Sequence, residues 1–242
     1  MYSQNVRRQA LAMLQDGISI NRISRSLGVS RAAIAQWRDA PEIVDSCPAP
    51  AQPTADYAAL FGFYLGDGCI SRVGRAYSLR ICCDAAWPGV IADVTARVTA
   101  VHPARRTYLV PSAGAVTVQS YWKHWPCLFP QHGPGRKHER ALGMAAWQWQ
   151  VVEQHPAAFL RGLFHSDGCR VRNWATRMVA GRKKRYDYPR WQFTNHSAEI
   201  RGWCGEALDL VDVPWRQSNW KTISVSTRAG VARLDELIGP KS

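Results

Sequence analysis

The stretch LFGFYLGDG at residues 60–68 returns in a similar form as LRGLFHSDG at residues 160–168. Each copy reads as an apolar helix that ends in an acid followed by glycine, Asp67 in the first copy and Asp167 in the second. The helix dipole disfavours an acid at a helix C-terminus, so finding one twice indicates a purpose other than helix stability. The repetition predicts two copies of one structural unit in a single chain.

The residues around the two copies follow one order of elements. The first half reads as helix 56–68, strands near 69–73 and 76–83, helix 88–101, strands near 105–111 and 115–121, and a helical stretch at 122–130. The second half reads as helix 156–168, strands near 169–174 and 189–196, helix 197–211, strands near 215–219 and 221–227, and helix 229–238. Strand pairs with alternating burial predict two sheets, each covered by helices on one face. We therefore expect an α+β fold with a pseudo-two-fold αββαββα repeat.

Residues 1–40 are predicted to form a small all-α domain ahead of the repeat. Residues 5–38 contain three segments of helical spacing, and Gly17 and Gly28 stand where helices end. The last two segments resemble a helix-turn-helix, which binds DNA through its second helix. The residues expected on or near the exposed side of that helix are Ser30, Arg31, Ala32, Gln36 and Arg38. A small helical domain that binds protein, or no macromolecule, is the alternative.

The rest of the chain divides into a linker and the repeat. Residues 41–55 are rich in Pro and Ala, which predicts a semi-extended linker. Residues 56–242 hold the repeat, with half one at 56–138 and half two at 139–242. Half two carries the insertion ATRMVAGRKKRYDY at 175–188, which we expect to be a basic loop. Such a loop is either disordered and solvated or able to hold a phosphate backbone, with Lys183 and Lys184 as the candidate contacts.

The charge of the chain indicates a polyanionic partner. Its 31 Lys and Arg against 18 Asp and Glu give a formal net charge of +13. Nucleic acid is favoured over a membrane surface, and a charge that serves only solubility is the alternative. No apolar run approaches the roughly 20 residues that span a bilayer, and the first residues lack the apolar region of a signal peptide. We therefore expect a cytoplasmic protein that binds no membrane and associates with the nucleoid when bound to DNA.

Small residues four positions apart share one face of each repeated helix, and these residues are Gly62, Gly66, Gly162 and Ser166. Such faces allow two helix backbones to approach closely. If the helices pack through them, the carboxylates of Asp67 and Asp167 arrive side by side. Two adjacent acids favour a divalent cation, and oxygen ligands suit magnesium better than zinc. A metal site is therefore expected at the two acids, with Gly66 and Ser166 beside them.

The paired motifs, one hundred residues apart, and the αββαββα order resemble the single-chain LAGLIDADG homing endonucleases over residues 56–242. The resemblance implies that the motif helices form the interface between halves, and that Asp67 and Asp167 bind the catalytic metal, magnesium or another divalent cation such as manganese. Leu65 and His165 stand at the motif's earlier acid, a position that varies in this family. The family also places a basic residue near each metal site. The Gly-Pro and trailing Lys shared by GPGRK and GPKS make Lys137 and Lys241 the candidates.

The activity that the resemblance implies is metal-assisted hydrolysis of both strands of a specific duplex DNA by a monomer. The two sheets are expected to form a saddle whose solvent-facing side chains read base edges in the major groove. The side chains expected there are Arg72, Arg75, Arg80, Arg106, Tyr108, Gln119, Arg172, Arg190, Gln192, Arg216 and Lys221. An ordinary solvated strand face is the alternative for each of them. Two other functions remain open: a non-cleaving DNA-binding transcriptional regulator of this fold, as in the WhiA family, and an RNA-binding or RNA-splicing cofactor.

Overall fold

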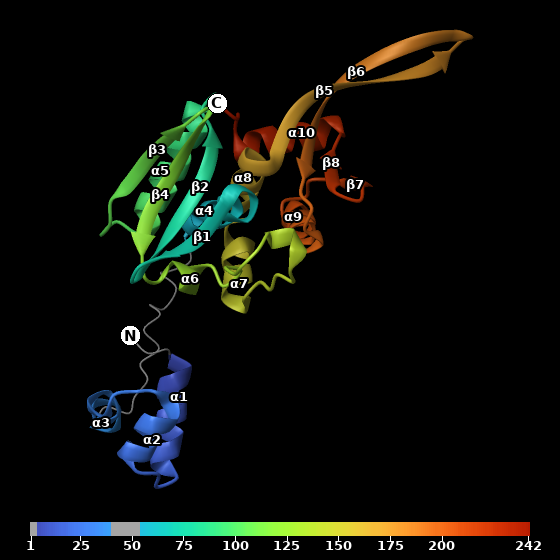
Figure 1. Cartoon of the computed structure of the whole chain (residues 1–242). Helices are drawn as coiled ribbons and strands as arrows, with labels where there is room; N and C mark the ends of the chain where they lie inside the picture. The colour runs from blue at the N-terminus through green and yellow to red at the C-terminus, as the bar shows by residue number, and fades with distance from the viewer. Residues whose placement is uncertain (1–3, 40–53) are drawn as a thin grey trace. The chain divides into compact units, whose positions relative to one another are not determined.

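The computed structural model describes residues 4–39 and 54–242, which belong to two units (Figure 1). The first unit falls within residues 1–48 and the second within residues 49–242. Most of the linker predicted at 41–55 lies outside the described residues, and helix α4 already begins at Ala55. Within the described residues, no helix has the length and apolar character needed to cross a membrane.

The first unit contains three short helices around a small core. They are α1 (Gln4–Gln15), α2 (Ile20–Leu27) and α3 (Arg31–Asp39). The Ser19 hydroxyl caps α2 by accepting a hydrogen bond from the backbone N–H of Arg22, and Gly28 ends it with a φ of 64°. The core consists of Ala10, Ile23, Val29 and Ile34. The three predicted helices are therefore all present.

The second unit contains the αββαββα order twice, as the sequence predicts. The first copy is α4 (Ala55–Asp67), β1 (Gly68–Val73), β2 (Ala76–Asp84), α5 (Pro88–Val101), β3 (Thr107–Ser112), β4 (Ala115–Trp122) and α6 (Trp125–Leu128). The second copy is α8 (Pro156–Asp167), β5 (Gly168–Val179), β6 (Arg182–Thr194), α9 (Ala198–Asp209), β7 (Arg216–Asn219), β8 (Thr222–Val225) and α10 (Arg228–Ile238). Between the copies lie a 3-10 turn at Lys137–Glu139 and α7 (Ala146–Gln154), a helix that the sequence did not predict.

Each copy forms one antiparallel sheet of four strands. The strand orders are β1-β2-β4-β3 and β5-β6-β8-β7, so the two sheets have the same topology. Helix α4 is buried all along from Tyr57 to Leu65, because α8, α5, α7 and the first sheet all contact it. A helix covered on several sides has no polar face, which explains why its sequence is apolar throughout. The predicted α+β fold is confirmed.

The insertion at 175–188 is not a loop, and that prediction is wrong. Strands β5 and β6 continue through it as a two-stranded ribbon, paired without a break from Gly168 with Phe193 to Val179 with Arg182. Ala180 and Gly181 connect the strands with φ angles of 49° and 75°, the left-handed values that tight hairpin turns require. Both faces of the ribbon are exposed, so its residues do not alternate between apolar and polar and the strands were not recognisable.

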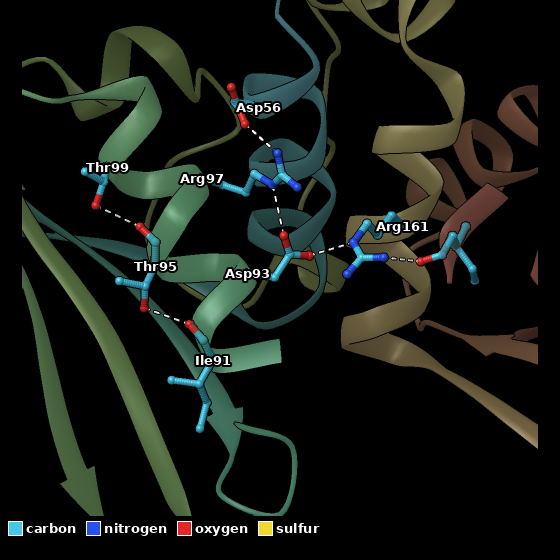
Figure 2. Close-up of polar contacts among 8 residues, drawn as sticks. Asp56, Ile91, Asp93, Thr95, Arg97, Thr99 and Arg161 are labelled. Atoms are coloured by element: carbon cyan, nitrogen blue, oxygen red, sulfur yellow. Dashed lines mark hydrogen bonds and ion pairs between the residues drawn. The ribbon is translucent and has the colours of Figure 1, made fainter. Parts of the chain in front are cut away.

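A buried carboxylate joins the two copies away from the repeated motifs (Figure 2). Asp93 of α5 accepts hydrogen bonds from the Nε atoms of Arg97, at 3.0 Å, and of Arg161 on α8, at 2.7 Å. Arg97 also pairs with Asp56 of α4, and Arg161 also donates to the carbonyl oxygen of Ile238 at the end of α10. The Asp93 side chain is 8% exposed, so its charge depends on these two partners.

Candidate functional site

Helices α4 and α8 meet through the small residues of the repeated motif. A Cβ carbon added to Gly62 would overlap the backbone of Phe159 and Leu163, and one added to Gly162 would overlap the backbone of Ala59 and Phe63. One turn further along, a Cβ on Gly66 would overlap the side chain of Ser166. Only small residues therefore permit this crossing, which brings the C-terminal ends of the two helices together.

Asp67 and Asp167 are the last residues of these two helices. Asp67 keeps more than a third of its surface open to solvent, whereas Asp167 is half-buried. Loss of hydration on its protein-facing side, and then repulsion from Asp167, raise the pKa of Asp67 to about 6. Loss of hydration also raises the pKa of Asp167. A Cβ carbon added to Gly66, the residue before Asp67, would come 3.2 Å from Oδ2 of Asp167, so the two acids lie near each other across the helix interface.

Asn195 supports one of the two acids directly. Its side-chain Nδ2 donates to Oδ2 of Asp167 at 2.7 Å, which favours the charged form of that carboxylate and lowers its pKa. Its Oδ1 accepts from the backbone N–H of Ser197, which fixes the amide orientation. In the first copy, Asp84 accepts in the same way from the backbone N–H of Ala86. The sequence reading missed this pair of residues, although both stand at the end of the second strand of their copy.

Lys137 binds the C-terminal end of α4. Its ammonium group donates to the backbone carbonyl oxygens of Tyr64, Leu65 and Gly66, the last two at 2.9 and 3.1 Å. The same group lies 4.9 Å from the ring centroid of Tyr64. Desolvation lowers its pKa to about 8, while Asp167 and Asp67 act in the opposite direction. A cation at a helix C-terminus is favoured by the helix dipole, so this lysine offsets the charge at the end of α4.

Lys241 occupies the corresponding place on α8. Its ammonium group lies 3.3 Å from the carbonyl oxygen of Ser166 and 3.4 Å from that of Gly168. The segment that carries it is held at both ends: His165 Nε2 lies 3.3 Å from the carbonyl oxygen of Gly239, and the carbonyl oxygen of Ser242 accepts from the backbone N–H of Val90 at 3.0 Å. His165 is buried, and desolvation lowers its pKa to about 4, so its imidazole is neutral. His165 therefore helps to hold the segment that carries Lys241.

Each acid shares an open cavity with the lysine of the other half. A cavity of about 640 Å³ is lined by Asp167 with Lys137 and Asn195. A smaller cavity of about 200 Å³ is lined by Asp67 with Lys241 and Asp84. Neither lysine forms a direct ion pair with either acid among the described residues. The lysine of each half therefore lines the cavity of the other half's acid without forming a direct ion pair with it.

The carboxylate groups of Asp67 and Asp167 offer hard oxygen atoms as metal ligands, and such ligands fit magnesium or manganese. The carbonyl oxygens of Gly66 and Ser166, expected beside the metal, are already bonded to Lys137 and Lys241. The Ser166 hydroxyl donates back to its own helix, at Gly162 and Leu163. The carboxylates of Asp67 and Asp167 are thus the available ligands. The described residues hold no group of three His, Cys, Asp or Glu side chains that could bind a metal ion together.

The open face of the first sheet carries a connected row of polar side chains. Cys69, Arg80, Gln119 and Tyr108 are direct neighbours across the four strands, so they point to the same face. Arg80 donates to Ser71, and Gln119 donates to the hydroxyls of Ser78 and Tyr121. Arg106 lies over the Tyr108 ring, 5.3 Å from its centroid. Ser71, Ser78 and Tyr121 were missed, although alternation from Arg80 and Gln119 could have found them.

The open face of the second sheet has a matching row. Arg190 and Gln192 lie on one face of β6, and Arg216 of β7 reaches the same face through its pairing with Ser224. Arg190 donates to the hydroxyl of Ser218 at 2.8 Å, and that hydroxyl donates to Ser224. Two further predicted residues, Arg75 and Lys221, lie in the turns β1–β2 and β7–β8. Arg80 pairs with Cys69 and Gln192 pairs with Cys169, so these two residues hold equivalent places in the two sheets.

Two predicted residues do not share this face. In β1, Arg72 lies on the face opposite to Cys69 and Ser71. It shares that face with Ile70, which is buried in the core. Arg172 likewise lies on the side of Trp191 rather than that of Arg190. Its nearest carboxylate is Asp187, at 3.8 Å. Because strand residues alternate between faces, the expected placement of these two arginines on the open face does not hold.

In the first unit, the residues singled out on α3 are exposed: Ser30, Arg31, Ala32, Gln36 and Arg38. Ser30 caps the helix by accepting from the backbone N–H of Ala33 at 3.3 Å. Arg38 pairs with Asp39 at 2.9 Å. The unit therefore presents α3 with a polar outer side, built on the buried Ile34.

No family model matches the chain, and no curated protein matches it. Among solved structures, the chain is similar to the N-terminal LAGLIDADG domain of WhiA, with 9% sequence identity over 80% of this chain and 85% of that chain and a TM-score of 0.46. It is similar to the homing endonuclease I-DmoI in complex with DNA and manganese, with 10% identity over 78% and 99% of the two chains and a TM-score of 0.49. The meganuclease I-AabMI bound to uncleaved DNA is similar at 13% identity, over 75% and 82%, with a TM-score of 0.46. Identities this low carry no residue roles over to this chain.

Proposed function

We propose that the second unit is a site-specific endonuclease of duplex DNA, with one cleavage site at Asp67 and one at Asp167. The observation that carries the proposal is the crosswise arrangement of the two acids, each in an open cavity with a lysine of the other half. Two like charges at helix C-termini destabilise the folded chain unless a cation balances them. The arrangement provides one acid for each strand of a duplex, related by the pseudo-two-fold repeat.

The two carboxylates are the proposed ligands of magnesium or another divalent cation such as manganese. A divalent cation held there would supply Lewis-acid chemistry by neutralising negative charge on a scissile phosphate. Asn195 donates a hydrogen bond to Asp167, which favours the charged form of that carboxylate and orients it. Lys137 and Lys241 place a positive charge in each cavity, where it would stabilise the charge that develops on the phosphate during cleavage.

Duplex DNA is the proposed partner because the open faces of both sheets carry cations and amides. Arg80 with Gln119, and Arg190 with Gln192, are the side chains that we propose to contact base edges, since each pair lies on one open sheet face. The net charge of +13 supplies the general attraction to phosphate. For the first unit we propose a helix-turn-helix role, in which Arg31 and Gln36 of α3 add contacts to DNA. The protein is proposed to act as a monomer, since one chain contains both sites.

The test is selection followed by cleavage. Duplexes that the full chain binds are enriched from a random library in EDTA, then incubated with Mg²⁺, and product ends are mapped by sequencing. The parent should break both strands at one sequence. Asp67→Asn and Asp167→Asn should each nick one strand, and the double variant should leave the duplex intact while still binding it. Tight selective binding by the parent without any Mg²⁺-dependent product would contradict the endonuclease proposal.

That contrary result would support a second candidate, a non-cleaving DNA-binding regulator. One observation favours it: Asp67, Asp167, Lys137 and Lys241 have a formal charge that sums to zero, so the site can persist without a metal. Isothermal titration with Mn²⁺ of the parent and of the double Asn variant separates the two candidates, because it measures metal binding by each chain. An endonuclease requires Mn²⁺ binding that the double variant loses, whereas a regulator requires none.

A further inference from the structure

The ribbon of β5 and β6 extends beyond the second sheet as an arm with no partner strand on either side (Figure 1). We define the arm as residues 174–187, which pair from Trp174 with Asp187 to Val179 with Arg182. Strand β8 pairs with β6 only from Trp191 to Thr194, so the third strand stops before the arm begins. The first copy has no such arm, because β1 ends at Val73 and turns at once into β2.

The arm is strongly basic and exposes large apolar side chains. It contains five basic residues, Arg177, Arg182, Lys183, Lys184 and Arg185, against the single acid Asp187. Trp174, Met178, Val179 and Tyr186 of the arm are between 40% and 68% exposed. An isolated two-stranded ribbon is at best marginally stable in water, so Val179 and Tyr186, which share a face with Arg177 and Lys184, are stabilised when a partner covers them. A partner for this surface must be anionic and must also offer apolar contact.

The two faces of the arm differ in charge. Residues opposite each other in the ladder share a face, so Arg177 with Lys184 and Val179 with Arg182 lie on one side. That side continues the row formed by Arg190 and Gln192, and it carries no acid. The other side carries Lys183 and Arg185, and there Asp187 pairs with Arg185 at 2.9 Å. Arg185 also lies 5.1 Å from the ring centroid of Trp174, so its charged group contacts two residues of the arm, Trp174 and Asp187.

We propose that the arm follows the duplex beyond the cleavage sites on the second-half side, with the face of Arg177, Arg182 and Lys184 toward the major groove and its phosphates. A two-stranded antiparallel ribbon fits the major groove, and Tyr186 on the same face supplies apolar contact beside Lys184, whose ammonium lies 5.4 Å from its ring centroid. The arm is a continuation of the strands that carry Arg190 and Gln192, so it stays in the groove that they are proposed to read. This inference rests on the proposed function.

The length of the arm predicts how many base pairs of duplex it covers. Six residue pairs at about 3.3 Å each give an arm about 20 Å long. At 3.4 Å per base pair, this covers about 6 base pairs of duplex. Because only the second copy has an arm, the DNA contact extends on one side alone and the footprint is asymmetric about the cleavage sites.

The first test removes the arm. Replacing residues 174–187 by Asn-Gly joins Asn173 to Tyr188 with a two-residue turn, and it removes six pairs, so the alternation of hydrogen-bonded pairs is kept. Hydroxyl-radical protection and guanine N7 methylation are measured on the duplex that the full chain selects, in EDTA. The truncated chain should lose protection over about 6 base pairs on one side and keep the rest of the footprint. An unchanged footprint overturns the arm proposal and leaves the proposed function standing.

The second test compares the two faces at equal charge. Arg177→Ala with Lys184→Ala should lower the slope of log affinity against log salt by about 2, since each phosphate contact contributes about 0.9. Lys183→Ala with Arg185→Ala changes the net charge by the same amount on the other face and should change the slope by less than half as much. Equal effects of the two pairs would overturn the assignment of the face. Arm removal that weakens binding to RNA hairpins but not to the selected duplex would overturn DNA as partner, and a chain that selects no duplex overturns both proposals.

Discussion

Gly62 of α4 and Gly162 of α8 lie back to back, so close that a Cβ carbon on either would come 2.9 Å from the Cα atom of the other. All features of the site depend on this contact, because it brings the ends of the two helices together. Gly62→Ala should lower the free energy of unfolding by about 2 kcal/mol or more, since backbone atoms on both sides cannot yield. Urea unfolding followed by tryptophan fluorescence measures the loss.

The matched control for this change is Gly202→Ala in α9. A Cβ there would meet nothing within 4 Å, and the position is exposed within a helix. The same substitution should therefore raise stability there by about 0.5–1 kcal/mol through helix propensity. A similar loss at both glycines would mean that the close helix contact is not what makes Gly62 necessary.

Asp93 should be the most costly carboxylate to remove outside the site. Asp93→Ala leaves Arg161 without its carboxylate partner, in a partly buried place, and leaves Arg97 paired with Asp56; losing one partner of a buried pair costs about 3–5 kcal/mol. A double-mutant cycle with Arg161→Ala isolates the coupling across the two copies. Removing the exposed hydroxyl of Thr99, which meets Thr107 at 3.1 Å, serves as the control and should change little. If the losses of stability caused by Asp93→Ala and by Arg161→Ala simply add in the double variant, the coupling between the two residues is excluded.

The pKa of Asp67 predicts a defined pH dependence of stability. Its folded-state pKa of about 6 lies above the ordinary 3.8, so the folded chain binds more protons than the unfolded chain between these values. The contribution of Asp67 is therefore most favourable below about pH 4 and is lost as pH rises through about 6. Asp67→Asn should gain stability relative to the parent across this window. Urea unfolding of both chains at matched pH values measures the difference, and a difference independent of pH would contradict the raised pKa.

Lys137 should lower the pKa of both acids. Its positive charge lowers the pKa of Asp67 and that of Asp167, so Lys137→Met should raise both values. The titration of carboxyl carbons by ¹³C NMR reports each acid separately once the Asp67→Asn and Asp167→Asn spectra assign them. Lys123→Met removes an exposed lysine of the same charge elsewhere and should leave both titrations in place.

Asn195 should distinguish the two cleavage sites. Asn195→Asp keeps an acceptor for the backbone N–H of Ser197 but replaces the donor to Asp167 by a second negative charge. The pKa of Asp167 should rise, and cleavage of one strand should slow, so that nicked duplex accumulates. Asp84→Asn is the reciprocal change in the first copy. It should speed cleavage of the strand cut at Asp67 relative to cleavage of the other strand. Equal slowing of both strands by Asn195→Asp would contradict a role for Asn195 at one site only.

The repeat and the helix contact were predictable because each depends on local pattern. Apolar helical spacing, alternating strands and turn residues recur in both copies, and glycines four apart predict a close helix crossing whatever lies around them. The ribbon at 175–188 was not predictable in the same way. Its strands have no buried face, so the period of two that marks a strand is absent.

The sequence by itself determined the two copies, their order of elements, the acids Asp67 and Asp167 and the small residues that let the helices cross. Only the tertiary structure decided how the groups around those acids are arranged: Lys137 and Lys241, already named from the sequence, are bound to helix carbonyls in the cavity of the opposite acid, Asn195 contacts Asp167 alone, and the arginines of each strand are divided between the two faces. The physical reason is that helix spacing and strand alternation act over a few residues. Contacts between ends of different elements are fixed only when the two copies pack.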